Sequence, residues 1–264
     1  GVIDVVHQKA YEFDADGKAK PIGIPGEEKA LLDSTRERLI EIVAESDDAL
    51  MEKYFESGTL PEEDIIPNLA RAIASSKLCP VYAVSATNLV GIQILLDHLV
   101  EFAPNPATHE MEYGFKDNEM TGDRINRKYN NDEPFSAYVF RTIADPFAGR
   151  INVMKVVSGK ISSDATVQNT TRDVPERLGA LHVISGKTLD KVPEAATGDI
   201  IAVVKLKDTQ TGDTLADKAK PIVYPKVEYP EAAIAFAIEP KSRADEDKIS
   251  SALHKILEED PSLH

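Results

Sequence analysis

The sequence predicts a multidomain protein in which a mixed α/β region is followed by an antiparallel β region and then by the start of a further α+β region. Apolar residues recur at helical spacing through most of residues 28–101, and short strands separated by turn residues follow from residue 135. The length of 264 residues is long for one domain and suits two.

Composition narrows the class of protein. An apolar content of 42% supports a folded protein, and no apolar run approaches the roughly 20 residues of a membrane span. The first residues, Gly-Val-Ile-Asp, show no basic region ahead of an apolar one as a signal peptide would, so we expect a cytoplasmic protein without a membrane partner. The net charge of −15 opposes general attraction to nucleic acid, so DNA is not expected as a partner and any RNA contact must be local.

The first region combines short strands with two helices. Residues 1–6 and 9–13 are expected to be strands, with a turn at 14–17 leading into 18–24. A helix is expected from residue 28 to 55, and a second after Pro61, which suits the first helical position. The apolar stripe of the first helix is Leu32, Leu39, Val43, Leu50 and Tyr54, and its acidic face is Glu41, Glu45, Asp48, Glu52 and Glu56.

The stretch VSATNLVGI, residues 84–92, lies between an apolar run at 79–83 and a helical pattern at 92–101. A strand that ends in small polar residues and turns into a helix is a common place to hold a nucleotide. Cys79 is the single cysteine, so it forms no internal disulfide. Because it lies in the apolar run, we expect it to be packed in a buried strand. The helix should bury the stripe Ile92, Leu95, Leu96, Leu99 and Val100.

Most of the second half of the sequence has a pattern of short strands instead of helices. Residues 107–133 are polar and are expected to form a linker or an exposed hairpin. Strands are expected at 135–143, 151–157, 165–169, 178–184 and 199–206, at a spacing that fits a closed antiparallel barrel. A strand at 232–238 and a helix after the capping-box spacing of residues 242–245 would begin a third domain, and we expect that domain to be truncated.

Several short motifs imitate functional sites. Ser185-Gly-Lys-Thr188 has Leu181 where a phosphate loop needs its first glycine, and Asp14-Ala-Asp-Gly17 is better explained as a hairpin turn than as a GTPase D-x-x-G. Residues 169–173 lack the lysine of N-K-x-D. The histidines show no pair at metal-ligand spacing, so we expect no metal site, and no catalytic residue is assigned.

Four segments resemble bacterial elongation factor G, in order along the chain: residues 132–150, 198–203, 206–215 and 239–245. Residues 163–167 and the long polar linker are similar to an elongation-factor-G-like paralogue subfamily. The resemblance implies an internal fragment: residues 1–103 would hold an inserted subdomain and the C-terminal part of a P-loop GTPase G domain, 104–132 a linker, 133–225 the translation-factor barrel, and 226–264 the truncated start of domain III.

The resemblance also implies roles for particular residues. Ser85 and Ala86, and more weakly Thr87, would approach the guanine oxygen, while the phosphate loop, D-x-x-G and N-K-x-D would precede Gly1. The intact protein would bind GTP or GDP with magnesium, whereas this chain alone is expected to hold neither and to be inactive. The ribosome is the implied partner, through small-subunit RNA at the barrel and through the stalk protein at the acidic helix near Glu45–Glu56.

Three functions remain open at this point. The chain could be a fragment of a GTPase that couples GTP hydrolysis to ribosomal translocation or recycling. A ribosomal-protection factor would share the barrel. A noncatalytic barrel that binds a protein partner would belong to a different class and would need no phosphate loop in the parent gene.

Overall fold

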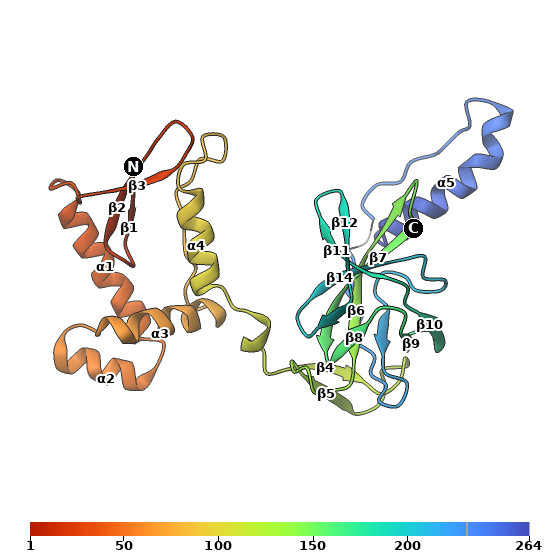
Figure 1. Ribbon diagram of the computed structural model, residues 1–264, viewed down its shortest axis with the longest axis horizontal. Helices are drawn as coiled ribbons and strands as arrows, with labels where there is room; N and C mark the ends of the chain where they lie inside the picture. Colours follow the sequence, from red (N-terminus) through yellow and green to blue (C-terminus); the bar gives the residue numbers. More distant parts are fainter. Residues whose placement is uncertain (231, 264) are drawn as a thin grey trace. The chain divides into compact units, whose positions relative to one another are not determined.

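The computed structural model describes residues 1–230 and 232–263, apart from the side chains of residues 244, 246 and 247. The chain forms two compact units, Gly1–Thr108 and His109–His264, and each is described separately (Figure 1). Among the described residues, no helix combines the length and the apolar character needed to span a membrane.

The first unit begins with a small antiparallel sheet. Strands β1 (Val2–Asp4), β2 (Lys9–Phe13) and β3 (Ala19–Ile22) pair in the order β1-β2-β3. The turn between β2 and β3 is held by Asp14, whose Oδ1 accepts hydrogen bonds from the backbone N–H groups of Asp16 (3.0 Å) and Lys18 (2.9 Å). The prediction that residues 14–17 form a hairpin turn is confirmed.

Four helices complete the first unit: α1 (Lys29–Ala44), α2 (Asp48–Ser57), α3 (Glu62–Ala74) and α4 (Ile92–Phe102). The single helix predicted over residues 28–55 is wrong, because the chain breaks after Ala44. Ser46 donates its hydroxyl to the Val43 carbonyl, and the extended Asp47 caps α2 by accepting from the N–H of Ala49 at 3.0 Å. The break turns the acidic residues 48–56 into a separate short helix.

Helix α4 buries a different face from the one predicted. Ile94, His98 and Phe102 are its buried residues, while Leu96, Leu99 and Val100 of the predicted stripe are 51%, 50% and 89% exposed. The helix is therefore apolar on two sides, and one side packs on the core of this unit. A second apolar face on a helix normally packs against a partner of its own.

The apolar run at residues 79–83 has no regular secondary structure and is not the buried strand that we predicted. No described strand pairs with it, and Cys79 is exposed rather than packed. An extended segment becomes part of a sheet only where a neighbouring strand satisfies its backbone groups, and apolar composition alone does not supply that neighbour.

The second unit opens with a hairpin, the second of the alternatives for residues 107–133. After a 3-10 turn, η1 (Pro106–Thr108), which closes the first unit, β4 (Met111–Phe115) pairs with β5 (Arg124–Lys128). Phe115 and Val223 exchange two backbone hydrogen bonds of 2.8 Å, so the hairpin is attached to the segment that follows the barrel.

An eight-stranded antiparallel sheet forms most of the second unit, in the order β10-β9-β15-β6-β7-β14-β11-β12, with β13 pairing β8 separately. The strands are β6 (Ser136–Asp145), β7 (Gly149–Ser158), β8 (Lys160–Ser162), β9 (Thr166–Asn169), β10 (Val174–Arg177), β11 (Leu181–Ser185), β12 (Thr188–Val192), β13 (Glu194–Ala196), β14 (Ile200–Val204) and β15 (Thr214–Ala216).

The sheet curls around one core, as the predicted barrel requires. Side chains from strands far apart in the sheet, among them Val139, Met154, Val167, Leu181 and Leu215, belong to a single buried cluster. This confirms the prediction of an antiparallel barrel. Gly186 and Lys187 lie in the turn between β11 and β12, where no helix follows, so the S-G-K-T sequence forms a hairpin turn and not a phosphate loop.

The C-terminal segment packs on the outside of the barrel. After η2 (Arg243–Asp245), helix α5 (Glu246–Glu259) contacts β6, and Glu258 forms an ion pair with Arg150. Ser242 bonds to the side chain of Asp245 at 2.7 Å, so no capping box forms with the backbone. The strand predicted at 232–238 is wrong: this segment is exposed and has no regular secondary structure, without a partner among the described residues.

The buried Tyr224 hydroxyl should make the stability of the barrel fall at alkaline pH. It is buried and bonds to Ser136 Oγ at 2.7 Å, which bonds in turn to Ser158 Oγ at 2.6 Å. Burial raises the pKa of Tyr224 to about 12. Because an unfolded tyrosine has a pKa of about 10, the favourable contribution of the neutral hydroxyl is complete below pH 10 and is lost between about pH 10 and 12, costing roughly 2 kcal/mol.

Urea unfolding at several alkaline pH values, followed by circular dichroism, checks this. Tyr224→Phe should lower the starting stability by about 1 kcal/mol, because the hydrogen bond to Ser136 is lost, yet it should lose less stability between pH 10 and 12 than the parent chain. Equal losses in the two chains would show that Tyr224 does not titrate as expected.

Candidate nucleotide-binding turn

The turn between the 79–84 segment and α4 has a defined backbone. Ser85 and Val90 form an isolated antiparallel bridge, in which the Ser85 N–H donates to the Val90 carbonyl at 2.9 Å. Residues 86–89 form the turn itself, and their side chains are exposed. Gly91 follows with φ of +75° and accepts the first helical hydrogen bond, from Leu95 at 3.0 Å. An extended segment, a turn and a helix thus stand where we predicted a strand, a turn and a helix.

The turn between β2 and β3 packs closely against the turn at residues 86–89. Gly17, in the β2–β3 turn, has φ of +76°, and a Cβ atom there would lie 2.4 Å from the Leu89 Cβ and 2.9 Å from the Asn88 carbonyl oxygen. Only glycine permits both this conformation and this approach. The hairpin turn whose sequence is similar to a D-x-x-G motif therefore packs directly against the candidate nucleotide-binding turn.

The predicted site residues Ser85, Ala86 and Thr87 lie together on this turn, but their backbone groups differ. The Ser85 N–H is already used by Val90. Within the described part of the chain, the N–H groups of Ala86 and Thr87 donate no hydrogen bond. They are the donors that an approaching carbonyl oxygen would meet, whereas Ser85 could contribute only its hydroxyl.

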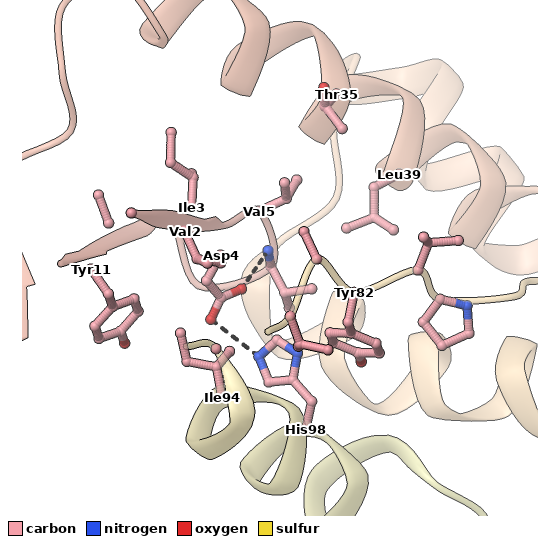
Figure 2. Close-up of a pocket in the computed structure, with 18 of the residues that line it drawn as sticks. Val2, Ile3, Asp4, Val5, Tyr11, Thr35, Leu39, Tyr82, Ile94 and His98 are labelled. Carbon is pink, nitrogen blue, oxygen red and sulfur yellow. Dashed lines mark hydrogen bonds and ion pairs between the residues drawn. The ribbon is translucent and has the colours of Figure 1, made fainter. Parts of the chain in front are cut away.

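A cavity of about 1120 Å³ lies beside the turn, between β1, α1, residues 78–84 and α4. Its lining is largely apolar, with Tyr11, Tyr82 and Ile94 among its side chains (Figure 2). Val84 and Gly91, at the base of the turn, also line it. Asp4 and His98 point toward each other in this cavity and are joined at 3.1 Å between Asp4 Oδ2 and His98 Nε2.

Asp4 is a functional candidate that the sequence analysis missed. Its Oδ1 accepts from the backbone N–H groups of Val6 (3.0 Å) and His7 (3.1 Å), and its Oδ2 faces His7 Nδ1 at 2.8 Å as well as His98. Asp4 and His98 are 94 positions apart, so no local spacing could have shown that they meet.

The groups around Asp4 and His7 shift the pKa values of these two residues. Burial by itself would raise the pKa of Asp4, but hydrogen bonds from the backbone and ring of His7, with the charges of both histidines, place that pKa below its usual value. Burial would lower the pKa of His7, but the carboxylates of Asp4 and Glu101 raise it overall. Glu101 lies 3.3 Å from His7 Nε2.

The acidic helix α2 is the second predicted contact region. Asp48, Glu52 and Glu56 are exposed at four-residue spacing on one face. Beside them Phe55 is 78% exposed, although Leu50 from the same helix is buried in the core. An exposed aromatic ring within an acidic surface is a feature that the charge pattern alone did not indicate.

The barrel and the helix that follows it define the class of protein, which is that of the translation factors. Residues 134–218 match the sequence model of elongation factor G domain 2, and residues 229–264 match that of elongation factor G domain III. These matches, which together cover less than half of the chain, support an elongation factor G fragment, as the resemblance predicted. The assignment to a paralogue subfamily, and the domain boundaries at 103, 132 and 225, remain predictions.

A solved structure supports the fold over the whole chain. A crystal structure of a protein from Thermus thermophilus matches with a TM-score of 0.83 and 30% sequence identity, covering 100% of this chain and 37% of that chain. The chain therefore spans a little more than a third of the length of that similar protein.

Gly17→Ala should deform the candidate turn. The added Cβ would clash with Leu89 and would also force alanine into a left-handed conformation, so the free energy of unfolding should fall by about 1–3 kcal/mol. Gly23→Ala is the matched control, because a Cβ at Gly23 meets nothing within 4 Å. Urea unfolding of both variants measures the difference, and equal stability would contradict the contact between the two turns.

Proposed function

We propose that this chain is part of an elongation factor G-like GTPase that acts on the ribosome and couples GTP hydrolysis to translocation or recycling. The observation that carries the proposal is the order of its parts: a barrel that matches elongation factor G domain 2, followed at once by a segment that matches domain III. A lone barrel that binds a protein partner would not need the second match.

In this proposal residues 84–91 contribute the base-reading turn of the G domain. The N–H groups of Ala86 and Thr87 would donate to the guanine oxygen, and Ser85 would hold the turn through Val90. The exposed apolar side of α4 and the segment 79–84, which pairs with no described strand, support this assignment, because both present surfaces that further strands of a G domain would cover.

The phosphates and magnesium must be bound elsewhere in the intact protein. The sequence of this chain contains no G-x-x-x-x-G-K-[ST]. Phosphoryl transfer depends on positioned phosphates, a metal ion and an oriented water. The proposal therefore assigns GTP or GDP with magnesium to the whole protein, and assigns this chain neither tight nucleotide binding nor hydrolysis.

A titration with fluorescent GDP tests the nucleotide assignment. We expect no tight binding by the chain of residues 1–264, and tight binding by a longer product of the parent gene that includes a phosphate loop. In the longer product, Ala86→Leu should weaken GDP binding by about tenfold, or 1.4 kcal/mol, because its side chain would crowd the guanine. Ala107→Leu, also at an exposed alanine, is the control. Tight binding by the short chain would refute the proposal.

The ribosome is the proposed partner, with the barrel facing small-subunit RNA and the acidic α2 contacting the stalk protein. The acidic face with Phe55 at its edge fits a basic, amphipathic protein segment. The same face would repel RNA, so a protein is the better occupant of this surface.

Reversing two charges on α2 tests the stalk contact. Glu52→Lys with Glu56→Lys should weaken binding to purified stalk protein by about tenfold, with a smaller effect at high salt. Asp117→Lys with Glu119→Lys changes the net charge equally on the exposed β4–β5 loop and should have little effect. If both double variants bind alike, the contact is not at α2.

A further inference from the structure

Two pairs of metal-binding residue types converge at one point of the first unit. Asp4 and His7 lie at the end of β1 and in the turn after it, and His98 and Glu101 lie one turn apart on α4. Asp4 Oδ2 is 2.8 Å from His7 Nδ1 and 3.1 Å from His98 Nε2. The prediction of no metal site rests on the spacing of histidines along the sequence, which does not show that residues distant in the sequence meet in the fold.

We propose that Asp4, His7 and His98 form a zinc-binding site. One ligand atom from each residue lies within 4.8 Å of the other two. Tetrahedral zinc with bonds of about 2.0–2.2 Å places its ligand atoms about 3.3 Å apart, so small shifts of the two rings would admit the ion. Two imidazoles with a carboxylate are a donor set that suits zinc and other first-row metals, whereas magnesium and calcium prefer oxygen ligands alone.

The surrounding groups hold these ligands in position. The second oxygen of Asp4 is fixed by the backbone N–H groups of Val6 and His7. The second ring nitrogen of His7 faces Glu101 at 3.3 Å, which would fix the tautomer that leaves Nδ1 free for the metal. A histidine ligand whose other nitrogen bonds a carboxylate is the usual arrangement at protein zinc sites.

Burial favours the site, and the cavity gives access to it. Asp4 and His98 are both buried, and Phe102 and Tyr82 lie against the His98 ring with centroid separations of 5.1 Å and 5.4 Å. Asp4 and His98 also line the cavity of Figure 2. Three protein ligands beside an open cavity leave a fourth position for water or an exogenous ligand.

The proposal is independent of the nucleotide assignment. Zinc would join the end of β1 to α4, and it would stabilise the folded first unit, because the ligands come together only in the folded state. Without a metal, the same residues would form a hydrogen-bonded Asp–His cluster, and the experiment distinguishes the two.

The test is a titration of the chelator-treated chain with Zn²⁺ by calorimetry, and with Co²⁺ by visible absorption. We expect one equivalent of Zn²⁺ to bind with a micromolar or lower Kd, and Co²⁺ to give the absorption of a tetrahedral site. Saturable binding should also raise the midpoint of thermal unfolding. The absence of saturable uptake at micromolar Zn²⁺ would overturn the proposal.

Variants locate the binding. His98→Gln keeps an amide donor for Asp4, so the fold should persist by circular dichroism while the affinity falls by at least about 100-fold. Glu101→Gln, on the surface of α4, should cost about 10–100-fold by releasing the His7 ring. His254→Gln and Cys79→Ser are controls, since Cys79 lines the same cavity and His254 is an exposed histidine of α5. Binding that survives His98→Gln or is lost in Cys79→Ser would place the metal elsewhere.

Discussion

The first unit depends on the hydrogen bonds of one buried carboxylate, that of Asp4. One of its oxygens closes the turn after β1 by accepting two backbone N–H groups, and the other reaches His98 on α4. A buried carboxylate is costly unless it is hydrogen-bonded or paired, so β1 and α4 must stay together for the charge to remain satisfied. Since α4 begins directly after residues 84–91, the same carboxylate fixes the base of the candidate nucleotide-binding turn.

The first unit leaves apolar surface uncovered beside the candidate nucleotide-binding turn. The barrel closes around its own core, and some of its buried polar groups, such as the hydroxyls of Tyr224 and Ser136, bond to each other. The first unit has one core under α1, α3 and α4, but leaves the outer face of α4 and the segment 79–84 exposed. Large exposed apolar surfaces on a folded unit mark places that another part of a protein covers. This uncovered surface is the physical basis for treating the turn as one part of a larger site.

The sequence predicted those elements whose signals are local. The hairpin at Asp14–Gly17 and the barrel strands follow from turn residues and alternation, and both are present. The break at Ser46–Asp47 was missed because the apolar stripe continues through it, although Asp47 is a good N-cap. The buried face of α4 was missed because periodicity cannot choose between two apolar faces, and the Asp4–His98 contact because 94 residues separate its members.

Base reading and phosphate binding make separable demands on a GTPase, and on the proposed function the turn at 84–91 would meet only the first. Its Ala86 and Thr87 N–H groups, which donate to no described residue, are neutral donors, and each would contribute about 1 kcal/mol of net binding. Charged phosphates with magnesium, by contrast, engage several strong, charge-assisted contacts at once. A chain that holds the turn without a phosphate loop would therefore discriminate guanine from adenine only when other segments supply the affinity. On the proposed function, residues 84–91 set which nucleotide is bound, and the affinity comes from elsewhere in the protein.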